Sequence, residues 1–361
     1  MNEIKEKTKI NYLMTEAIRR HVSDLHLMVD SPPYIRLQGE LNPLPDEPLL
    51  KAAEIEIMIF SLCSQTQKEV IVTNKELDFS YNFQNKVRFR INAYYQNGTL
   101  AAALRLVPNK IKKIDELFLP PICHQLVKLK QGLVLITGPT GHGKSTTIAS
   151  MINEINHTQA VHIITVEDPI EFTFKPEKAI ISQRELRKDT HSWLLALRSV
   201  LREDPNVVFV GEMRDLETIK AALTIAETGH LVFSTLHTNS AAQTIDRIVD
   251  VFPRGNRDQI RLQFSNVLSG VISQRLVPVL SGGRRPAVEI MLGSTAVKTA
   301  IREGKSHMID NIIQTSREMG MISLENSLAD LVSKGQASLE VAQKYALRPQ
   351  DLLRMVGKGE R

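Results

Sequence analysis

Cysteine and aromatic residues are scarce in this sequence. Its 361 residues include two cysteines, Cys63 and Cys123, and one tryptophan, and aromatic side chains make up 5% of the chain. The two cysteines lie far apart and neither has a neighbouring cysteine, so they cannot build a disulfide framework or a CxxC metal site. We expect both to be small apolar side chains, buried in a protein of a reducing compartment.

Long apolar runs and blocks of like charge are also missing. No apolar run approaches the about 20 residues of a membrane span, and the N-terminal residues lack the apolar segment of a secretory signal. The net charge of +5, from 45 basic and 40 acidic residues, is too small to indicate a nucleic-acid partner by itself. We therefore expect a cytoplasmic protein that reaches a membrane only through a partner.

Hydrophobic residues make up 42% of the chain, enough for a buried core and for two compact domains with an appendage. Short runs at 25–29, 34–37, 87–93 and 100–107 are typical of an antiparallel sheet with one solvated face. The polar, lysine-containing stretch after them predicts a linker. The expected division is a small α+β domain at 1–107, a linker at 108–116, a core at 117–290 and a helical C-terminal region at 291–361.

The core has a different pattern. Continuous apolar runs at 133–136, 161–166, 207–210 and 231–235 alternate with segments of helical composition. This order predicts an α/β fold with a parallel sheet covered on both faces. From about residue 255 onward the pattern predicts helices, among them amphipathic helices within 294–302 and 324–346.

The segment from Gly138 to Ser145 matches G-x-x-x-x-G-K-[ST], with a predicted strand before it and a predicted helix after it. Glycines let the backbone turn its N–H groups toward phosphate oxygens, Lys144 can reach the β- and γ-phosphates, and the Ser145 hydroxyl can bind Mg²⁺. We interpret His142 as a loop-packing residue rather than a catalytic base. The residues expected to contact nucleotide are Gly138, Pro139, Thr140, Gly141, His142, Gly143, Lys144, Ser145 and Thr146.

Acidic residues and histidines lie at the ends of the other core strands. Glu212 follows the run 207–210 as the carboxylate of a Walker B element would, and 167–171 holds three carboxylates after another strand. Strand carboxyl ends face the ligand crevice of a parallel sheet, so these groups could hold Mg²⁺ or polarise water; a solvated charged turn is the alternative. His230 and His237 flank the run 231–235 and could sense phosphate or orient water, although a lone histidine is more often structural.

Three arginines lie on predicted strands of the first domain. Arg88 and Arg90 are two residues apart and should share one face of a strand, and Arg105 lies on another strand. An arginine from another domain or subunit can stabilise charge that develops on a phosphoryl group. From spacing alone, an exposed face of a half-solvated sheet explains them equally well.

Taken together, these motifs resemble the secretion-ATPase superfamily and, within it, the PilT-like ATPases of type IV pilus retraction. The resemblance covers nearly the whole chain. The matching blocks are Ser23–His26, Arg88–Ala93, the loop at 138–146, Glu167–Phe172, Leu201–Pro205, Val210–Asp215, Thr228–His230, Thr235–Thr238 and Asp246–Pro253.

The resemblance implies a PAS-like N-terminal domain, a RecA-like P-loop core and a homohexamer that binds ATP and Mg²⁺. It implies that Glu212 and Glu171 are needed for hydrolysis, with Glu171 near Mg²⁺ directly or through water. His230 and His237 fall in the family's His box. Arg88, Arg90 and Arg105 match N-terminal-domain arginines, some of which reach phosphates.

The function implied is an ATP-hydrolysing motor for pilus retraction and twitching motility, at the inner face of the cytoplasmic membrane. Its implied partners are an inner-membrane platform protein of the pilus and related retraction ATPases, not nucleic acid. Two departures stand out: His142 replaces a usual small residue, and the first half of the retraction motif at 296–303 has drifted.

The alternatives are a pilus-assembly or type II secretion motor, a weakly active accessory subunit, and a nucleic-acid motor. Assembly-type relatives usually carry a four-cysteine zinc module and a longer N-terminal region, neither of which the sequence shows.

Overall fold

The computed structural model describes residues 2–37, 39–84, 87–107 and 111–357, with side chains from residue 8 onward. The chain divides into two compact units, one of residues 1–110 with 169–173 and the other of residues 111–168 and 174–361. The first three residues of the predicted linker, 108–110, lie outside the described residues. No helix in the described part of the chain is both long and apolar enough to cross a bilayer.

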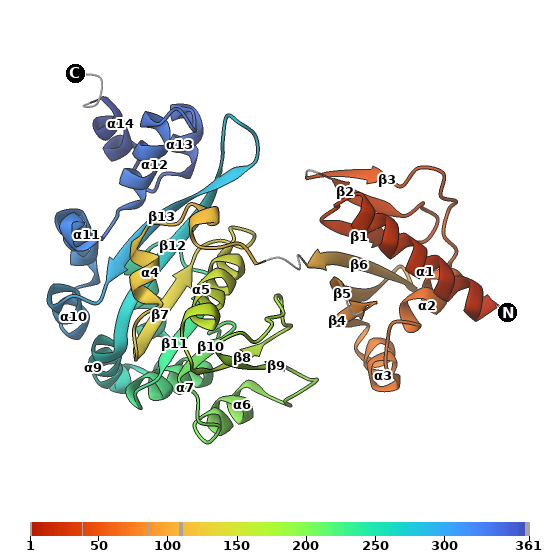
Figure 1. Cartoon of the computed structure of the whole chain (residues 1–361), viewed down its shortest axis with the longest axis horizontal. Helices are drawn as coiled ribbons and strands as arrows, with labels where there is room; N and C mark the ends of the chain where they lie inside the picture. Colours follow the sequence, from red (N-terminus) through yellow and green to blue (C-terminus); the bar gives the residue numbers. More distant parts are fainter. Residues whose placement is uncertain (1, 38, 85–86, 108–110, 358–361) are drawn as a thin grey trace. The chain divides into compact units, whose positions relative to one another are not determined.

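The first unit contains a six-stranded antiparallel sheet in the order β3-β2-β1-β6-β5-β4 (Figure 1). Its strands are β1 Asp24–Leu27, β2 Tyr34–Leu37, β3 Glu40–Pro43, β4 Glu76–Phe83, β5 Val87–Gln96 and β6 Thr99–Val107. Its helices are α1 Asn2–Arg19, α2 Ala52–Phe60 and α3 Gln65–Asn74. The strands predicted in this part of the chain are confirmed.

Strand β5 shows why this sheet forms. Phe89, Ile91 and Ala93 alternate along the strand and are fully buried in one cluster with apolar residues of α1 and α2. The period of two turns Arg88 and Arg90 to the opposite face. Because Arg105 lies directly across from Arg90 in the β5–β6 pair, all three arginines share that face.

The second unit is built on a seven-stranded sheet in the order β13-β12-β7-β11-β10-β8-β9. Its strands are β7 Gly132–Thr137, β8 His162–Glu167, β9 Ile180–Glu185, β10 Val207–Val210, β11 Leu231–Leu236, β12 Leu268–Pro278 and β13 Arg284–Leu292. Neighbouring strands are parallel except for the antiparallel β12–β13 pair at one edge. The four predicted core strands are confirmed as β7, β8, β10 and β11.

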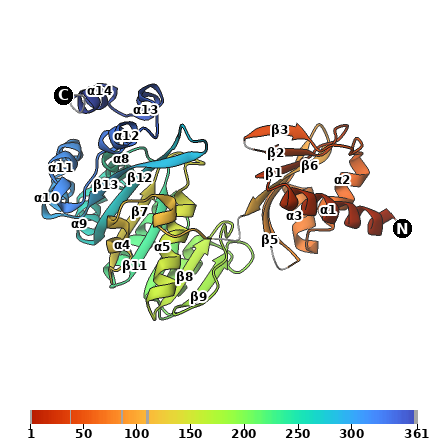
Figure 2. The same cartoon turned by 45° about the horizontal axis from the view of Figure 1, so that its top comes forward.

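Helices cover both faces of this sheet (Figures 1 and 2). They are α4 Ile122–Leu126, α5 Lys144–Thr158, α6 Trp193–Val200, α7 Leu216–Glu227, α8 Ala241–Asp250, α9 Arg257–Val267, α10 Thr295–Arg302, α11 Ile309–Thr315, α12 Leu324–Ser333, α13 Leu339–Tyr345 and α14 Pro349–Gly357. Helices α6 to α11 share one apolar cluster with β7, β8 and β10. Helix α5 packs against β7 and β11, and α12 to α14 form a separate cluster with residues of β12 and β13.

The prediction of an all-helical segment from about residue 255 was wrong. After α9 the chain forms β12 and β13 before the helices resume. The polar residues Ser273 and Gln274 interrupt the apolar pattern of β12, yet both are buried because they bond to other parts of the core. Strand β9 was also missed, since it is an edge strand with several partly exposed side chains.

Two further expectations concern local sequence. The helical prediction for 324–346 is confirmed as two helices, α12 and α13, separated by a turn in which Gly335 has a φ of +63°. Both cysteines are free; Cys123 is buried and Cys63 only partly so. Burial raises the pKa of each thiol to about 12.

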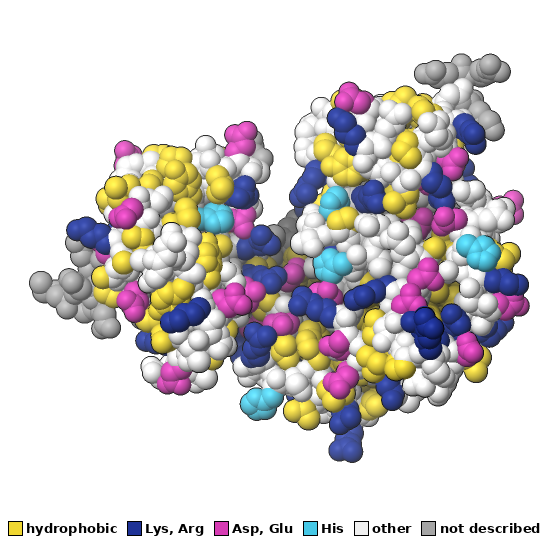
Figure 3. All heavy atoms as spheres, turned by 180° about the vertical axis from the view of Figure 1, so that it is seen from behind, with side chains coloured by type: hydrophobic (Ala, Val, Ile, Leu, Met, Phe, Trp, Pro, Cys, Tyr) yellow, Lys and Arg dark blue, Asp and Glu magenta, His cyan; other side chains and the backbone are white. Residues whose placement is uncertain are grey.

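Charged side chains of both signs are interspersed on the face that Figure 3 shows.

Candidate nucleotide-hydrolysis site

The parallel strands bring the predicted core residues to one edge of the sheet. Strands β7, β8, β10 and β11 run in the same direction, so their carboxyl ends lie together. The loop from Gly138 follows β7, Glu212 comes just after β10, and His237 comes directly after β11. Sequence reasoning predicted this convergence, and the structure shows it.

The loop after β7 requires glycine for two reasons. Gly138, Gly141 and Gly143 have φ values of +139°, +78° and +85°, a region that residues with a Cβ rarely adopt. A Cβ on Gly138 would also lie 2.3 Å from the carbonyl oxygen of Gln274 on β12. Helix α5 begins directly after the loop, and no side chain caps its N-terminus. Its N–H groups and the positive end of its dipole therefore favour an anion there.

Lys144 is 8% exposed and lies at the start of α5. Its Nζ donates to the carbonyl oxygens of Gly138 at 2.8 Å and Pro139 at 3.0 Å. The ammonium is therefore held against the loop backbone, where it can meet a phosphate bound by the same loop.

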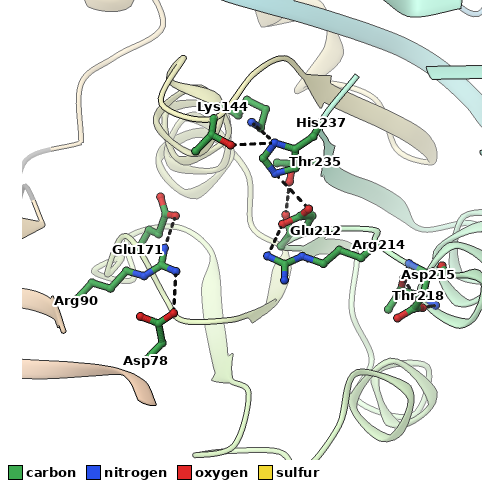
Figure 4. Close-up of polar contacts among 12 residues, drawn as sticks. Asp78, Arg90, Lys144, Glu171, Glu212, Arg214, Asp215, Thr218, Thr235 and His237 are labelled. Atoms are coloured by element: carbon green, nitrogen blue, oxygen red, sulfur yellow. Dashed lines mark hydrogen bonds and ion pairs between the residues drawn. The ribbon is translucent and has the colours of Figure 1, made fainter. Parts of the chain in front are cut away.

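His237 connects Lys144 to Glu212 (Figure 4). Its Nδ1 lies 3.4 Å from Lys144 Nζ and 3.3 Å from Thr140 Oγ1, and its Nε2 lies 3.2 Å from a Glu212 carboxylate oxygen. A proton on Nε2 would be donated to Glu212, and Nδ1 would then act as the acceptor toward Lys144 and Thr140. The other Glu212 oxygen lies 2.8 Å from Arg214, whose pKa is raised by this hydrogen bond.

The side chains near the loop fit a Mg²⁺ ion that is shared with phosphate oxygens, rather than a metal ion bound only by protein ligands. Among the described residues, no three His, Cys, Asp or Glu side chains cluster so as to hold a metal ion. Ser145 is the second residue of α5, beside the loop. A site with one hydroxyl, single carboxylates and phosphate oxygens is the kind that Mg²⁺ uses with nucleotides.

The three carboxylates of 167–171 have different surroundings. Glu167 is 6% exposed and accepts a hydrogen bond from Thr165 Oγ1 at 2.7 Å, so it is not part of a solvated turn. Glu171 belongs instead to the segment that packs with the first unit, where Arg90 Nη1 lies 3.6 Å from its carboxylate. Arg90 also lies 3.7 Å from Asp78.

The other two predicted arginines are also engaged within the first unit. Arg105 Nε lies 3.0 Å from Asp24, and Arg88 donates to Ser80 Oγ at 2.6 Å. The predicted shared face of Arg88 and Arg90 is confirmed. Their role toward phosphates stays a prediction.

His230 is not brought to the loop. It precedes β11, and its Nδ1 lies 3.0 Å from both the Ile225 carbonyl oxygen and Thr228 Oγ1. The six residues of β11 separate it from His237, a rise of about 20 Å along an extended strand. The two histidines therefore lie at opposite ends of one strand, and it is His237 of the two that lies near Lys144 and Glu212.

Sequence reasoning missed the residues of β12 that support the loop. Gln274 accepts from Thr147 Oγ1 at 2.7 Å and donates to the His142 carbonyl oxygen at 2.8 Å. The backbone N–H of Leu276 donates to His142 Nδ1 at 2.9 Å. The only signal in the sequence was a polar pair, Ser273 and Gln274, within an otherwise apolar run.

The predicted loop-packing role of His142 is confirmed by its contact with Leu276. Its ring also lies 6.4 Å from that of Tyr345 on α13. Burial, with the positive charges of Arg284, Arg275 and Lys144, lowers the pKa of His142. The neutral ring is therefore favoured, and Nδ1 can accept the Leu276 hydrogen bond only in that form.

We expect acid to weaken this support of the loop. Because folding lowers the pKa of His142, its contribution to stability is present above its unfolded pKa of about 6.5 and is lost as the pH falls through the folded value. His142→Asn keeps an acceptor near Nδ1 but cannot take up a proton. Melting temperatures between pH 5 and 8 should fall more steeply toward acid for the unmodified protein than for His142→Asn. Parallel curves would contradict this role.

Comparisons with known proteins agree with this geometry. Residues 3–354 match the family described as "Type II/IV secretion system protein". The "Type IV pilus retractation ATPase PilT" of Pseudomonas aeruginosa is 44% identical over 342 residues, which span 95% of this chain and 99% of that protein. The "Twitching motility protein" of Neisseria gonorrhoeae is 46% identical over 87% of this chain and 84% of its own length.

A solved structure is similar along the same length. It is described as "Crystal Structure of the Pilus Retraction Motor PilT and Bound ADP". It is 45% identical in sequence and superposes with a TM-score of 0.88, over 95% of this chain and 98% of its own. The similarity therefore includes both units of the fold and is not limited to the P-loop.

Proposed function

Because the chain belongs to the type II/IV secretion system protein family, we propose that it is an ATP-hydrolysing motor that retracts type IV pili and so drives twitching motility. The observation that carries the proposal is similarity to a pilus retraction ATPase along 95% of this chain and 99% of that protein. The site supports it, since Lys144, Glu212 and His237 lie together where a P-loop enzyme needs them.

Each group at the sheet edge has a role in this proposal. The loop amides and Lys144 would bind the phosphates of ATP, and the Ser145 hydroxyl would be a ligand for Mg²⁺. When bound, Mg²⁺ neutralises charge on the phosphate oxygens. Glu212 orients a water molecule and accepts its proton, while His237 holds the Glu212 carboxylate through Nε2.

The first unit contributes a second group of residues. Glu171 would support Mg²⁺ directly or through water, and Arg88, Arg90 and Arg105 would supply positive charge for the phosphoryl group as it is transferred. In this proposal the arginines exchange their present partners, such as Asp24 and Glu171, for phosphate oxygens.

The assembly follows from the family resemblance. We propose a homohexamer in the cytoplasm, in which closure of the two units around ATP does mechanical work. The hexamer acts at the inner face of the cytoplasmic membrane, on a platform protein of the pilus machine and together with related retraction ATPases.

A weakly active accessory subunit is the second candidate. The altered first half of the segment 296–303, which forms most of α10, favours it. The presence of Lys144 and Glu212 in contact with one histidine argues against it. Normal nucleotide binding with negligible turnover by the purified protein would favour the accessory role.

Deletion of the gene in its native host tests retraction directly. We expect cells that carry excess pili and do not twitch, because pili are extended but not withdrawn. Pili are counted by electron microscopy, and the unaltered gene supplied in trans should restore normal numbers. Cells without pili would instead indicate an assembly motor, and unchanged piliation would contradict both.

A further inference from the structure

Glu289 of β13 is a carboxyl group buried in the core, outside the site described above. It is 1% exposed, and its Oε1 accepts a hydrogen bond from the backbone N–H of Ala241 at 2.7 Å. Ala241 is the first residue of α8. Burial of a carboxyl group is costly unless it is well bonded, so its place at the start of this helix needs an explanation.

The start of α8 lies close in sequence to the catalytic edge. Only residues 237–240 separate Leu236, the last residue of β11, from Ala241. This short connection carries His237, which contacts Glu212 and Lys144. Thr238 in the same connection bonds to Thr244 of α8 at 2.7 Å. With so few residues between fixed ends, the position of Ala241 restricts where His237 can lie.

Arg348 pairs with other carboxylates, and Glu289 bonds to the first residue of α8. On the elements packed against β13, Arg348 pairs with Glu325 of α12 at 2.9 Å and also with Asp310 of α11. Burial lowers the pKa of Arg275 on β12, and the negative charges of Glu325 and Glu289 act against this shift. Arg348 is held by these two other carboxylates, and Glu289 accepts its hydrogen bond from the Ala241 N–H.

We propose that Glu289 is a positioning residue for ATP hydrolysis, which fixes the start of α8 and thereby holds His237 against Glu212 and Lys144. This inference rests on the proposed ATPase function, and it concerns a residue of β13 that bonds to the first residue of α8. Glu289 does not touch the reacting groups; it acts through the Ala241 amide and the connection 237–240.

The ionisation of Glu289 gives this role a pH dependence. Burial raises the pKa of Glu289 to about 7; the Ala241 N–H and Arg348 lower it, while Asp310 and Glu325 raise it further. An ionised carboxylate accepts the Ala241 hydrogen bond more strongly and suits the positive end of the α8 dipole. Above neutrality His237 should therefore be held more firmly. The free energy of unfolding should change in the opposite direction. Folding raises the pKa of Glu289, so the carboxyl group stabilises the fold most at acidic pH. This stabilisation is lost as the pH rises from the pKa of the unfolded chain to about 7.

Two substitutions separate the hydrogen bond from the charge. Glu289→Leu removes the acceptor and leaves the Ala241 N–H unpaired, whereas Glu289→Gln keeps an acceptor but cannot ionise. Ser327→Ala is a matched control, because Ser327 of α12 accepts through Oγ from the N–H of the neighbouring β13 residue Val288 at 3.0 Å. The full-length proteins are compared by kcat and KM for ATP, affinity for ADP, and melting temperature, from pH 5.5 to 8.5.

We expect Glu289→Leu to lower kcat by about tenfold or more, since small displacements of positioned groups cost that much. Affinity for ADP should change much less, because the loop amides and Lys144 remain. The kcat of the unmodified protein should rise as the pH increases through about 7, the pKa of Glu289, and Glu289→Gln should lack this rise. The melting temperature of Glu289→Gln should depend less on pH than that of the unmodified protein. Ser327→Ala should retain the unmodified kcat and pH profile.

The inference is overturned if Glu289→Leu folds and keeps the unmodified kcat, or if Glu289→Gln keeps the rise near pH 7. Should Glu289→Leu fail to fold, the pH profile of Glu289→Gln decides the question alone. If the unmodified protein binds ADP but hydrolyses no ATP, the proposed motor function fails and this inference fails with it. Hydrolysis by the unmodified protein with no effect of either Glu289 substitution overturns the inference alone.

Discussion

Glu212→Gln should lower the rate of ATP hydrolysis by about a hundredfold or more, because a positioned general base contributes at least that much. Glutamine keeps the size of the side chain and can still accept from His237 Nε2, so the loop and its contacts should survive. Affinity for ADP should therefore stay close to that of the unmodified protein. The measurements are the steady-state kcat and the equilibrium affinity for ADP.

Glu154→Gln provides the control for a partly buried, paired carboxylate. Glu154 lies 2.8 Å from His124, and its side chain is 22% exposed, compared with 20% for Glu212. It lies on α5, and both of its carboxylate oxygens are close to His124 Nδ1. We expect it to retain full turnover. Equal rates for Glu212→Gln and the unmodified protein would remove Glu212 from the mechanism.

Lys144→Ala should weaken binding of both ADP and ATP, and turnover should fall with it. The Lys144 ammonium donates to the carbonyl oxygens of Gly138 and Pro139, so it places a positive charge at the loop. Its loss removes the positive charge that faces the phosphates, and a charge-assisted bond of this kind is worth about 1.5–3 kcal/mol or more when desolvated. We expect affinity to fall about tenfold to a hundredfold or more.

The contrast between the two substitutions is the useful result. Glu212→Gln should bind nucleotide without hydrolysing it, whereas Lys144→Ala should do neither. Lys298→Ala is the control for loss of a lysine, because Lys298 donates to the Asn266 carbonyl oxygen at 3.3 Å and lies on α10, away from the loop. Undiminished ADP affinity in Lys144→Ala would contradict phosphate binding by this loop.

The sequence predicted those parts of the site that depend on local order. Lys144 belongs to a continuous motif, and Glu212 and His237 each follow an apolar run. A single rule, that parallel strands end at one edge, then brings them together. No contact between distant segments had to be known.

The missed parts depend on pairing between distant segments. Gln274 lies 132 residues from His142 in sequence, and neither its type nor its spacing indicates a loop support. Gln274 can be buried because it bonds to Thr147 Oγ1 and to the His142 carbonyl oxygen. A pattern of apolar and polar residues cannot predict such bonds between distant segments. The same limit explains why β12 was taken for helix, and why the packing of Glu171 with the first unit was not foreseen.

The association of residues 169–173 with the first unit means that the backbone passes between the two units three times. The crossings lie at 110–111, 168–169 and 173–174. The second crossing lies one residue after Glu167, the last residue of β8, and the third lies five residues beyond the second. Asp168 therefore joins the carboxyl end of β8 directly to Pro169, the first residue of a segment that clusters with the first unit.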